Sequence, residues 1–195
     1  MVAETPLHEL RQYLHAGYGL IALNTFEEER WLPDLENLAR SEGRQLEQWS
    51  TISSEEAYED LLEQLKVLTL GDNTHRMLLL KDIHAYLDDP QIVRALREVS
   101  QQGALHYNTV LLMGPDLKLP LELEKEAIVI DLPLPDYETM QLLIQEIFSE
   151  NELGANLESD LNERERLAQA LLGLTLSQAE RTLNKSARRC RKSIE

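Results

Sequence analysis

Cysteine is almost absent from this sequence: Cys190 is the only one among 195 residues. A single thiol excludes an internal disulfide and is typical of proteins that work in a reducing compartment. The chain also lacks a signal-like amino-terminal segment, and it has no apolar run of about 18 residues, the length of a transmembrane helix. We therefore expect a cytoplasmic protein that makes no contact with a membrane.

Basic residues are also scarce. Lys and Arg number 19 against 35 Asp and Glu, and residues 1–180 hold 13 basic against 34 acidic side chains. Because phosphate contacts need clustered Lys and Arg, this balance argues against nucleic-acid binding. The other bases gather in the tail KSARRCRKSIE, for which we favour a solvated helix end over contact with an anionic surface. Cys190 lies in this tail without a histidine partner, so we do not expect it to be catalytic.

Apolar runs and helical patterns alternate over residues 1–132. Each run is short enough for a buried strand, and the segments between them repeat apolar residues at helical spacing. This alternation predicts an α/β fold with a five-stranded, mainly parallel sheet and helices on both faces. After Pro133 three helical patterns follow, which predicts a helical, lid-like subdomain over residues 133–195. The predicted strands are residues 20–24, 46–49, 77–82, 109–114 and 127–132.

Several local signals predict where helices begin. Thr25 and Glu28 have the three-residue spacing of a capping box, so we expect the second helix to begin at Thr25. Pro33 inside that helical pattern predicts a kink or a late restart. Further cap candidates are Asp88, Asp89, Thr175 and Ser177.

This order of elements is that of the AAA+ ATPases, whose chemistry needs a phosphate-binding loop, G-x-x-x-x-G-K-[ST], after the first strand. The backbone N–H groups and the lysine of that loop hold the nucleotide phosphates. Here the junction reads LNTFEEER, residues 23–30, without glycine or lysine, and no Gly-Lys pair occurs in the chain. Glu27, Glu28 and Glu29 would repel a triphosphate at this position. We therefore expect no nucleotide cofactor.

The third predicted strand ends in an acid placed like a magnesium ligand of these enzymes. Asp82 follows the apolar run Met77–Leu80, but the next residue is Ile83 and not the glutamate that activates water. We favour a structural role in which Asp82 contacts His84, because alternate residues share a strand face. The alternative is a weak nucleotide-binding protein or NTPase without a P-loop, in which Lys81 contacts phosphate, Asp82 magnesium and His84 water.

Two more catalytic elements are missing. The fourth predicted strand ends in Gly114–Pro115, which offers no side chain that could sense a phosphate. Arg181 lies one turn into the last predicted helix, and we expect it to pair with nearby acids and not with nucleotide. We therefore predict a protein that is not an enzyme, with no catalytic residue, no metal site and no cofactor. The low-ranking candidates for nucleotide binding are Lys81, Asp82, His84 and Arg181.

Four segments occur in order along the chain: LHAGYGLIALNTFEEER, LLLKDIHAYLDDPQIVRALRE, TVLLMGPDLKLPLELEKEAIVIDLPLPDYE and LLGLTLSQAERTL. Together they resemble the amino-terminal region of an AAA+ family from cyanobacteria and algal plastids, known as a hypothetical chloroplast open reading frame product. The resemblance implies an AAA+-like module that lacks its own P-loop and precedes a conventional ATPase module. It also implies the cyanobacterial cytosol or the plastid stroma, and a link to regulation of photosynthesis or inorganic-carbon use.

The resulting prediction is a degenerate, non-catalytic AAA+-like module that acts as a protein-interaction or regulatory unit. The expected partner is a AAA+ ATPase, or the carboxyl-terminal module that this chain lacks. The chain ends at Glu195, which fits either an excised fragment or a stand-alone protein. An acidic body with a basic tail favours an oriented contact that salt weakens.

Overall fold

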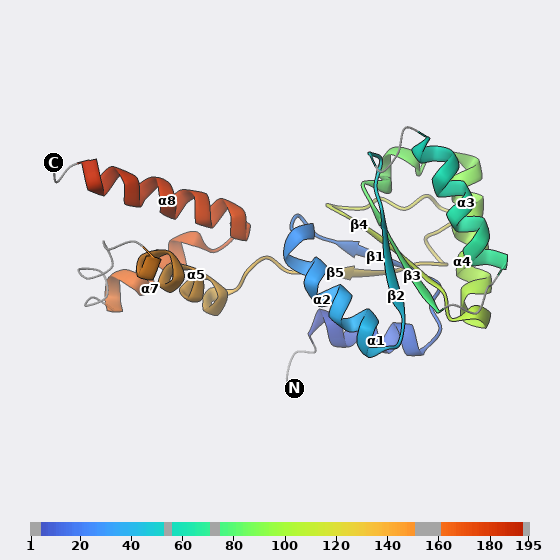
Figure 1. Cartoon of the computed structure of the whole chain (residues 1–195), viewed down its shortest axis with the longest axis horizontal. Coiled ribbons are helices and arrows are strands. Elements are labelled where there is room, and N and C mark those ends of the chain that lie inside the picture. Colours follow the sequence, from blue (N-terminus) through green and yellow to red (C-terminus); the bar gives the residue numbers. More distant parts are fainter. Residues whose placement is uncertain (1–4, 53–55, 71–74, 151–160, 193–195) are drawn as a thin grey trace. The chain divides into compact units, whose positions relative to one another are not determined.

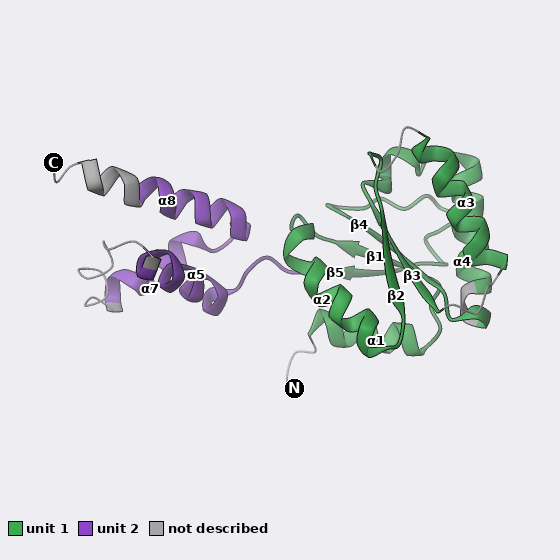
Figure 2. Cartoon of the chain, viewed as in Figure 1, with its two compact units in different colours: residues 1–132 green, residues 133–195 purple. Residues whose placement is uncertain are grey.

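The computed structural model describes residues 5–52, 56–70, 75–150 and 161–192; within these ranges, the side chains of residues 103–104, 150, 161 and 187–192 are left undescribed. The chain divides into two compact units, residues 1–132 and residues 133–195 (Figure 2). Unit 1 contains the sheet, and unit 2 is helical in its described part. Each unit is considered by itself below.

Unit 1 is built on a five-stranded sheet in the order β2-β3-β4-β1-β5, and every pairing in it is parallel. The predicted α/β fold with a parallel sheet is therefore confirmed. The central strands are continuous apolar runs, as strands buried on both faces require. The strands are β1 (Leu20–Asn24), β2 (Gln45–Trp49), β3 (Arg76–Lys81), β4 (Thr109–Gly114) and β5 (Ile128–Asp131).

Helices cover both faces of the sheet (Figure 1). Alternate strand residues point to opposite faces, so Leu20 packs in one core cluster while Ile21 packs in the other. The first cluster includes residues of α3 (Ala57–Leu70) and α4 (Pro90–His106), and the second includes residues of α1 (Pro6–His15) and α2 (Glu28–Ser41). A short 3-10 helix, η1 (Ile83–Tyr86), follows β3. Because all five strands run parallel, their carboxyl ends lie along one edge of the sheet.

The prediction that Thr25 caps the start of α2 is wrong, and so is the prediction of a late restart at Pro33, while a kink at Pro33 stays a prediction. The helix begins at Glu28 with Glu27 as its N-cap, and the Thr25 hydroxyl instead accepts the Glu27 backbone N–H at 3.0 Å. Pro33 lies inside the helix, which runs from Glu28 to Ser41 without a restart. The apolar face of α2 is buried against the sheet, and tertiary packing supplies most helical stability in proteins. That burial outweighs the local penalty of about 3 kcal/mol for an interior proline.

Two of the predicted caps are confirmed. The Asp89 carboxylate accepts the backbone N–H of Gln91 at 2.7 Å, at the start of α4. In unit 2 the Thr175 hydroxyl accepts the Gln178 N–H at 3.2 Å, and the Gln178 side chain accepts the Thr175 N–H at 3.1 Å. This reciprocal pair is a capping box.

Unit 2 contains α5 (Tyr137–Glu150), α7 (Leu161–Leu171) and α8 (Leu176–Lys192). Its own apolar core draws on all three helices, including Met140, Ile144, Ala168, Leu171, Ala179 and Leu183. Among the described residues, no helix is both long and apolar enough to span a bilayer.

Candidate functional site

The carboxyl edge of the sheet is the place where AAA+ ATPases hold nucleotide, and Asn24 organises it here. Asn24 ends β1 and pairs in register with Gly114 of β4 and Asp131 of β5. Its amide donates to the Asp131 carboxylate at 2.9 Å, and its carbonyl accepts the Leu117 N–H at 3.1 Å. Asn24 therefore ties β5 to the loop after β4. Sequence reasoning missed it, although a polar residue closing an apolar run is a visible signal.

The β1–α2 junction, where the sequence predicts no phosphate loop, is a turn held by hydrogen bonds. Thr25 is buried, and its backbone N–H donates to the Gly114 carbonyl at 3.0 Å. Glu27 is also buried, at 7% exposure, and its carboxylate accepts from Arg30 Nε at 2.8 Å. The Arg30 guanidinium lies over the Trp31 ring, 4.5 Å from its centroid. The Glu27 carboxylate is therefore buried at this junction and paired with Arg30, three residues further along the chain.

The next acid, Glu28, lies close enough to the end of β3 to interact electrostatically with it. Burial raises the pKa of Glu28, and the Asp82 carboxylate raises it further, while Lys81 lowers it. Two of the predicted candidates, Lys81 and Asp82, therefore face the start of α2 at this edge. Glu28 and Asp82 together make the field there unfavourable for a phosphate.

The predicted contact between Asp82 and His84 is absent. β3 ends at Lys81, and Asp82 adopts a left-handed conformation with φ of 55°, so the alternation of a strand does not reach His84. Both side chains are exposed, and no hydrogen bond or ion pair joins them in the part of the chain that the structure describes. The Asp82 backbone carbonyl accepts the Ala85 N–H at 3.4 Å, as part of the turn into η1.

The remaining candidates lie in unit 2. Arg181 is exposed on α8, and within the described ranges it forms no ion pair, so its predicted pairing with acids is wrong. The side chain of Cys190 lies outside the described residues. No group of three or more His, Cys, Asp or Glu residues is arranged to hold a metal ion within those ranges. Lys81, Asp82 and His84 belong to unit 1, and Arg181 belongs to unit 2.

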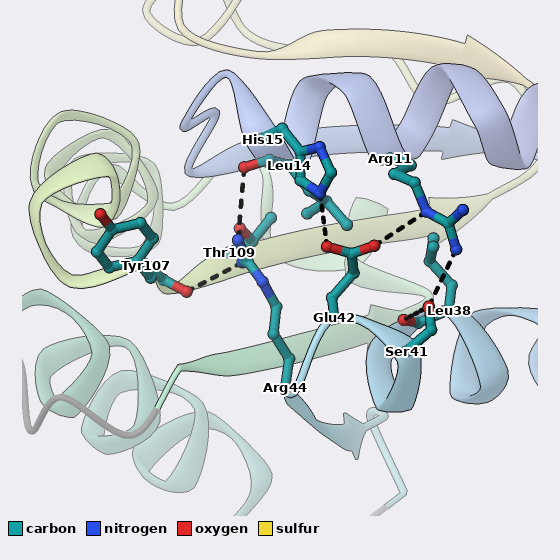
Figure 3. A network of polar contacts seen from close by, with 9 residues as sticks. All are labelled: Arg11, Leu14, His15, Leu38, Ser41, Glu42, Arg44, Tyr107 and Thr109. Atoms are coloured by element: carbon teal, nitrogen blue, oxygen red, sulfur yellow. Dashed lines mark hydrogen bonds and ion pairs between the residues drawn. The ribbon is translucent and has the colours of Figure 1, made fainter.

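A second polar network, which sequence reasoning missed, lies near the amino ends of the strands (Figure 3). Arg44 Nη1 donates to the Tyr107 carbonyl at 2.9 Å and to the Thr109 hydroxyl at 3.0 Å. Its Nη2 donates to the Leu14 carbonyl at 3.4 Å. Burial lowers the pKa of Arg44, and Glu42 opposes the change. One guanidinium therefore joins α1, the start of β2 and the start of β4.

Glu42 is the second centre of this network. Its carboxylate accepts from Arg11 Nε at 2.9 Å and forms a 2.6 Å contact with His15 Nε2, both from α1 (Figure 3). Arg11 also donates to the Ser41 hydroxyl at 3.0 Å. These contacts hold α1 against the end of α2, and we interpret them as structural.

The family of the chain follows from sequence comparison. The family model described as "SpoVK-like AAA ATPase, N-terminal domain" matches residues 6–132. The chain belongs to the SpoVK-like AAA ATPase family. The family's second domain matches residues 138–192, so the two matches fall in unit 1 and unit 2 of this SpoVK-like chain. The resemblance to the cyanobacterial and plastid AAA+ family is confirmed by curated relatives.

Those relatives bear the name "Uncharacterized AAA domain-containing protein ycf46". The protein from Trieres chinensis is 30% identical over 192 residues, which cover 91% of this chain and 37% of the relative. The protein from Guillardia theta is 27% identical over 189 residues, covering 91% of this chain and 36% of the relative. The SpoVK-like chain therefore spans little more than a third of the length of these relatives.

Solved structures share the fold at low sequence identity. A structure titled "Structural Basis for Katanin Self-Assembly" has a TM-score of 0.58 at 14% identity, covering 92% of this chain and 67% of that one. A DNA replication initiation factor has a TM-score of 0.59 at 15% identity, with coverage of 91% and 57%. C. elegans PCH-2 has a TM-score of 0.52 at 12% identity, with coverage of 91% and 60%. At these identities the likeness establishes only the fold of the SpoVK-like chain, which is of the AAA+ type.

Proposed function

We propose that this chain is a non-catalytic AAA+-like module that docks on a AAA+ ATPase and regulates it or receives its substrate. The observation that carries the proposal is the β1–α2 junction, where a phosphate loop would lie. There Glu27 is buried and paired with Arg30, so an acid and its own counter-ion fill the turn. A module with the fold of an ATPase but with side chains in its nucleotide position still has the outer surface of that fold. We infer that this surface serves protein contacts.

The backbone of the junction supports the same conclusion. A phosphate loop binds its ligand through backbone N–H groups that have no other partner. In this turn the Thr25 N–H donates to the Gly114 carbonyl at 3.0 Å, and the Glu27 N–H donates to the Thr25 hydroxyl at 3.0 Å. Binding a phosphate here would break these bonds as well as bring it close to carboxylates.

Electrostatics point in the same direction. A phosphate beside the start of α2 would face Glu28, whose pKa is raised by burial and further by Asp82, as well as the Asp82 carboxylate itself. Repulsion between two unit charges at 4 Å is about 4 kcal/mol at an effective dielectric of about 20. Lys81 offsets only part of this field. The edge therefore disfavours ATP, with or without magnesium.

The proposed partner is a P-loop ATPase module of the same family, either on a separate chain or in a longer form of this one. The curated relatives extend well beyond the matched third, which leaves room for such a module. By the same family resemblance we place the protein in the cyanobacterial cytosol or the plastid stroma, with a role in regulating photosynthesis or inorganic-carbon use. The acidic charge of unit 1 favours a charge-complementary partner surface.

A titration with nucleotide tests the non-catalytic half of the proposal. Calorimetry and thermal-shift measurements with ATP, ADP and magnesium at millimolar concentration should show neither binding heat nor a rise in melting temperature. Saturable binding that is lost in both Lys81→Ala and Asp82→Asn would replace the proposal by the alternative, a weak nucleotide-binding protein or NTPase without a P-loop. Arg94→Ala is the matched control, because Arg94 is an exposed base on α4 that pairs with Glu98.

A second titration tests docking. The full chain is mixed with the P-loop module of a longer relative, and association is followed by sedimentation at low and at high salt. We expect a complex that weakens as salt screens the charges. No complex at low salt would contradict the docking proposal, and an affinity independent of salt would contradict its electrostatic basis.

A further inference from the structure

A small cavity in unit 2 lies between α5 and α7, and it is lined by none of the residues that the sequence singled out. Its volume is about 170 Å³, and it is lined by Gln141, Ile144, Gln145, Arg164 and Glu165. The three α5 residues lie at positions i, i+3 and i+4, so they present one helix face to the cavity. A pocket for a whole drug-sized molecule or nucleotide measures about 300–1,000 Å³, so this cavity fits a single functional group.

Arg164 is the feature of this cavity that needs an explanation. Its Nε atom is buried and has no hydrogen-bond partner, and the guanidinium forms no ion pair within the described ranges. An arginine side chain does not lose its proton in a protein, so the buried N–H remains a charged donor. Buried polar groups without a partner are rare in native proteins, and one that lies beside a cavity is a candidate to bind a water, an ion or a ligand there.

The surroundings of Arg164 match a carboxylate. A guanidinium presents Nε and one terminal nitrogen as a planar fork, which pairs with both oxygens of a carboxylate. Gln145 lines the same cavity with an amide that can donate a further hydrogen bond. Buried Ile144 supplies an apolar wall, and a low local dielectric strengthens a charged hydrogen bond.

The size and shape of the cavity favour a carboxylate among the oxyanions. Glu165 lines it together with Arg164, so an incoming anion meets one positive and one negative side chain, whose effects on its charge oppose each other. A planar carboxylate on a short stem fits both the volume of the cavity and the planar edge of the guanidinium.

We propose that the α5–α7 cavity is a carboxylate-binding site in which Arg164 holds the ligand through its Nε edge. The carboxylate comes either from a small organic acid or from an acidic side chain or carboxyl terminus of a polypeptide. The site belongs to unit 2 alone and goes beyond the proposed docking on an ATPase: it stands whether or not that partner binds.

The experiment follows the side-chain Nε–H signal of Arg164 by NMR in the full chain with isotope-labelled arginine. Acetate, inorganic phosphate and a short acetylated peptide rich in glutamate are titrated separately. We expect saturable shifts of the Arg164 signal with acetate, and weaker or no shifts with phosphate. Arg164→Gln should abolish saturable acetate binding, and Arg164→Lys should weaken it about tenfold because an ammonium lacks the planar fork. Arg166→Gln, which removes an exposed arginine of the same helix, should leave it unchanged.

Each outcome decides a specific point. If the affinity for the peptide exceeds that for acetate by about tenfold or more, the site binds a polypeptide carboxylate. Equal affinities assign it to a small acid. Shifts that never saturate, or that persist in Arg164→Gln, overturn the proposal. Tighter binding of phosphate than of acetate overturns the assignment to carboxylates. Thermal unfolding of each variant provides the folding check, and Arg164→Gln should melt no lower than wild type because it removes a buried N–H group that has no hydrogen-bond partner.

Discussion

Glu27 and Arg30 form an ion pair, with Arg30 Nε 2.8 Å from Glu27 Oε2, inside the turn that in ATPases of this fold binds phosphate. The side chains are 5% and 21% exposed for Glu27 and Arg30, so the pair is largely removed from water. An acid that would repel a nucleotide is here part of the folded core. The pair is the observation on which the proposal of a non-catalytic module rests.

Arg30→Ala should destabilise unit 1 by about 3 kcal/mol, because it leaves the buried Glu27 carboxylate without its counter-ion. Urea unfolding followed by tryptophan fluorescence measures the change. Arg94→Ala is the control: its ion pair with Glu98 has the similar spacing i, i+4 but is exposed, and its loss should cost less than about 0.5 kcal/mol. Equal losses in the two variants would contradict a special role for the Glu27–Arg30 pair.

Asp82→Asn should leave unit 1 as stable as before or raise its stability by about 0.5 kcal/mol after solvent screening. The substitution removes the charge that raises the pKa of Glu28, and asparagine tolerates the left-handed conformation at φ of 55°. NMR titration should therefore show a lower pKa for Glu28 in the variant. Asp116→Asn, at the other aspartate of positive φ, serves as control and should not change that pKa. A marked loss of stability would mean that Asp82 has a partner of its own.

Glu28→Gln should change how stability depends on pH. Burial raises the pKa of Glu28 above its usual 4.5, so the folded protein binds this proton more tightly than the unfolded chain does. The stabilising contribution is complete below pH 4.5 and is lost as the pH rises through the folded pKa. Above that window the variant should exceed the wild type by no more than about 0.5 kcal/mol, since Glu28 is partly exposed and screened.

The measurement for Glu28→Gln is a series of urea titrations across this pH range. Glu29→Gln is the control for the helix dipole, because Glu29 is an exposed acid in the same first turn of α2.

Glu126→Gln should change the pH dependence of stability in the opposite direction to Glu28→Gln. Hydrogen bonds from Gln101 and Arg97 lower the pKa of Glu126, so its contribution is present above the ordinary pKa and lost as the pH falls. Parallel curves for Glu28→Gln and Glu126→Gln would contradict both assignments.

Arg44→Ala should destabilise unit 1 by about 3 kcal/mol, because two partly buried acceptors and one exposed acceptor lose a charged donor. Arg44→Lys should recover little of this loss, since one ammonium cannot span the Leu14, Tyr107 and Thr109 oxygens. Arg40→Ala, which removes an exposed arginine with a hydrogen bond to Asn37, is the control and should change little. Hydrogen exchange at the start of β4 reports whether the loss is local to this network.

The order of elements could be predicted because each depends on local patterns. The run Leu20–Asn24 matches β1 as found, and Thr109–Gly114 matches β4, since both are bounded by clear turn signals. The start of α2 could not be predicted in the same way. Thr25 has the spacing of a capping box with Glu28, but its hydroxyl bonds the Glu27 N–H and its own N–H bonds Gly114 of another strand. Competition from a distant strand is invisible to a local pattern.

The candidate site divides similarly. The missing P-loop and the cluster of acids after β1 were readable from residues alone, because the loss of glycine and lysine is a local fact. The expected Asp82–His84 contact failed because the backbone leaves the strand at Asp82, where φ becomes positive. Asn24 could have been noticed as a polar residue that closes an apolar run, but its partner Leu117 lies about 90 positions away and could not be predicted. Arg44 joins three separate elements, and no local pattern indicates that role.

The sequence by itself determined the α/β class, the parallel sheet and the absence of a phosphate loop, because strand and helix periodicity and missing motif residues are local properties. Only the tertiary structure decided which acids are buried, which are paired and which face one another. The sequence shows which residues are charged. The free energy of each charge depends on its burial and on its distance to other charges, and only the folded chain sets both. Glu27, Glu28 and Glu29 are neighbours of one type, yet one is buried in an ion pair, one is half-buried beside Asp82, and one is exposed.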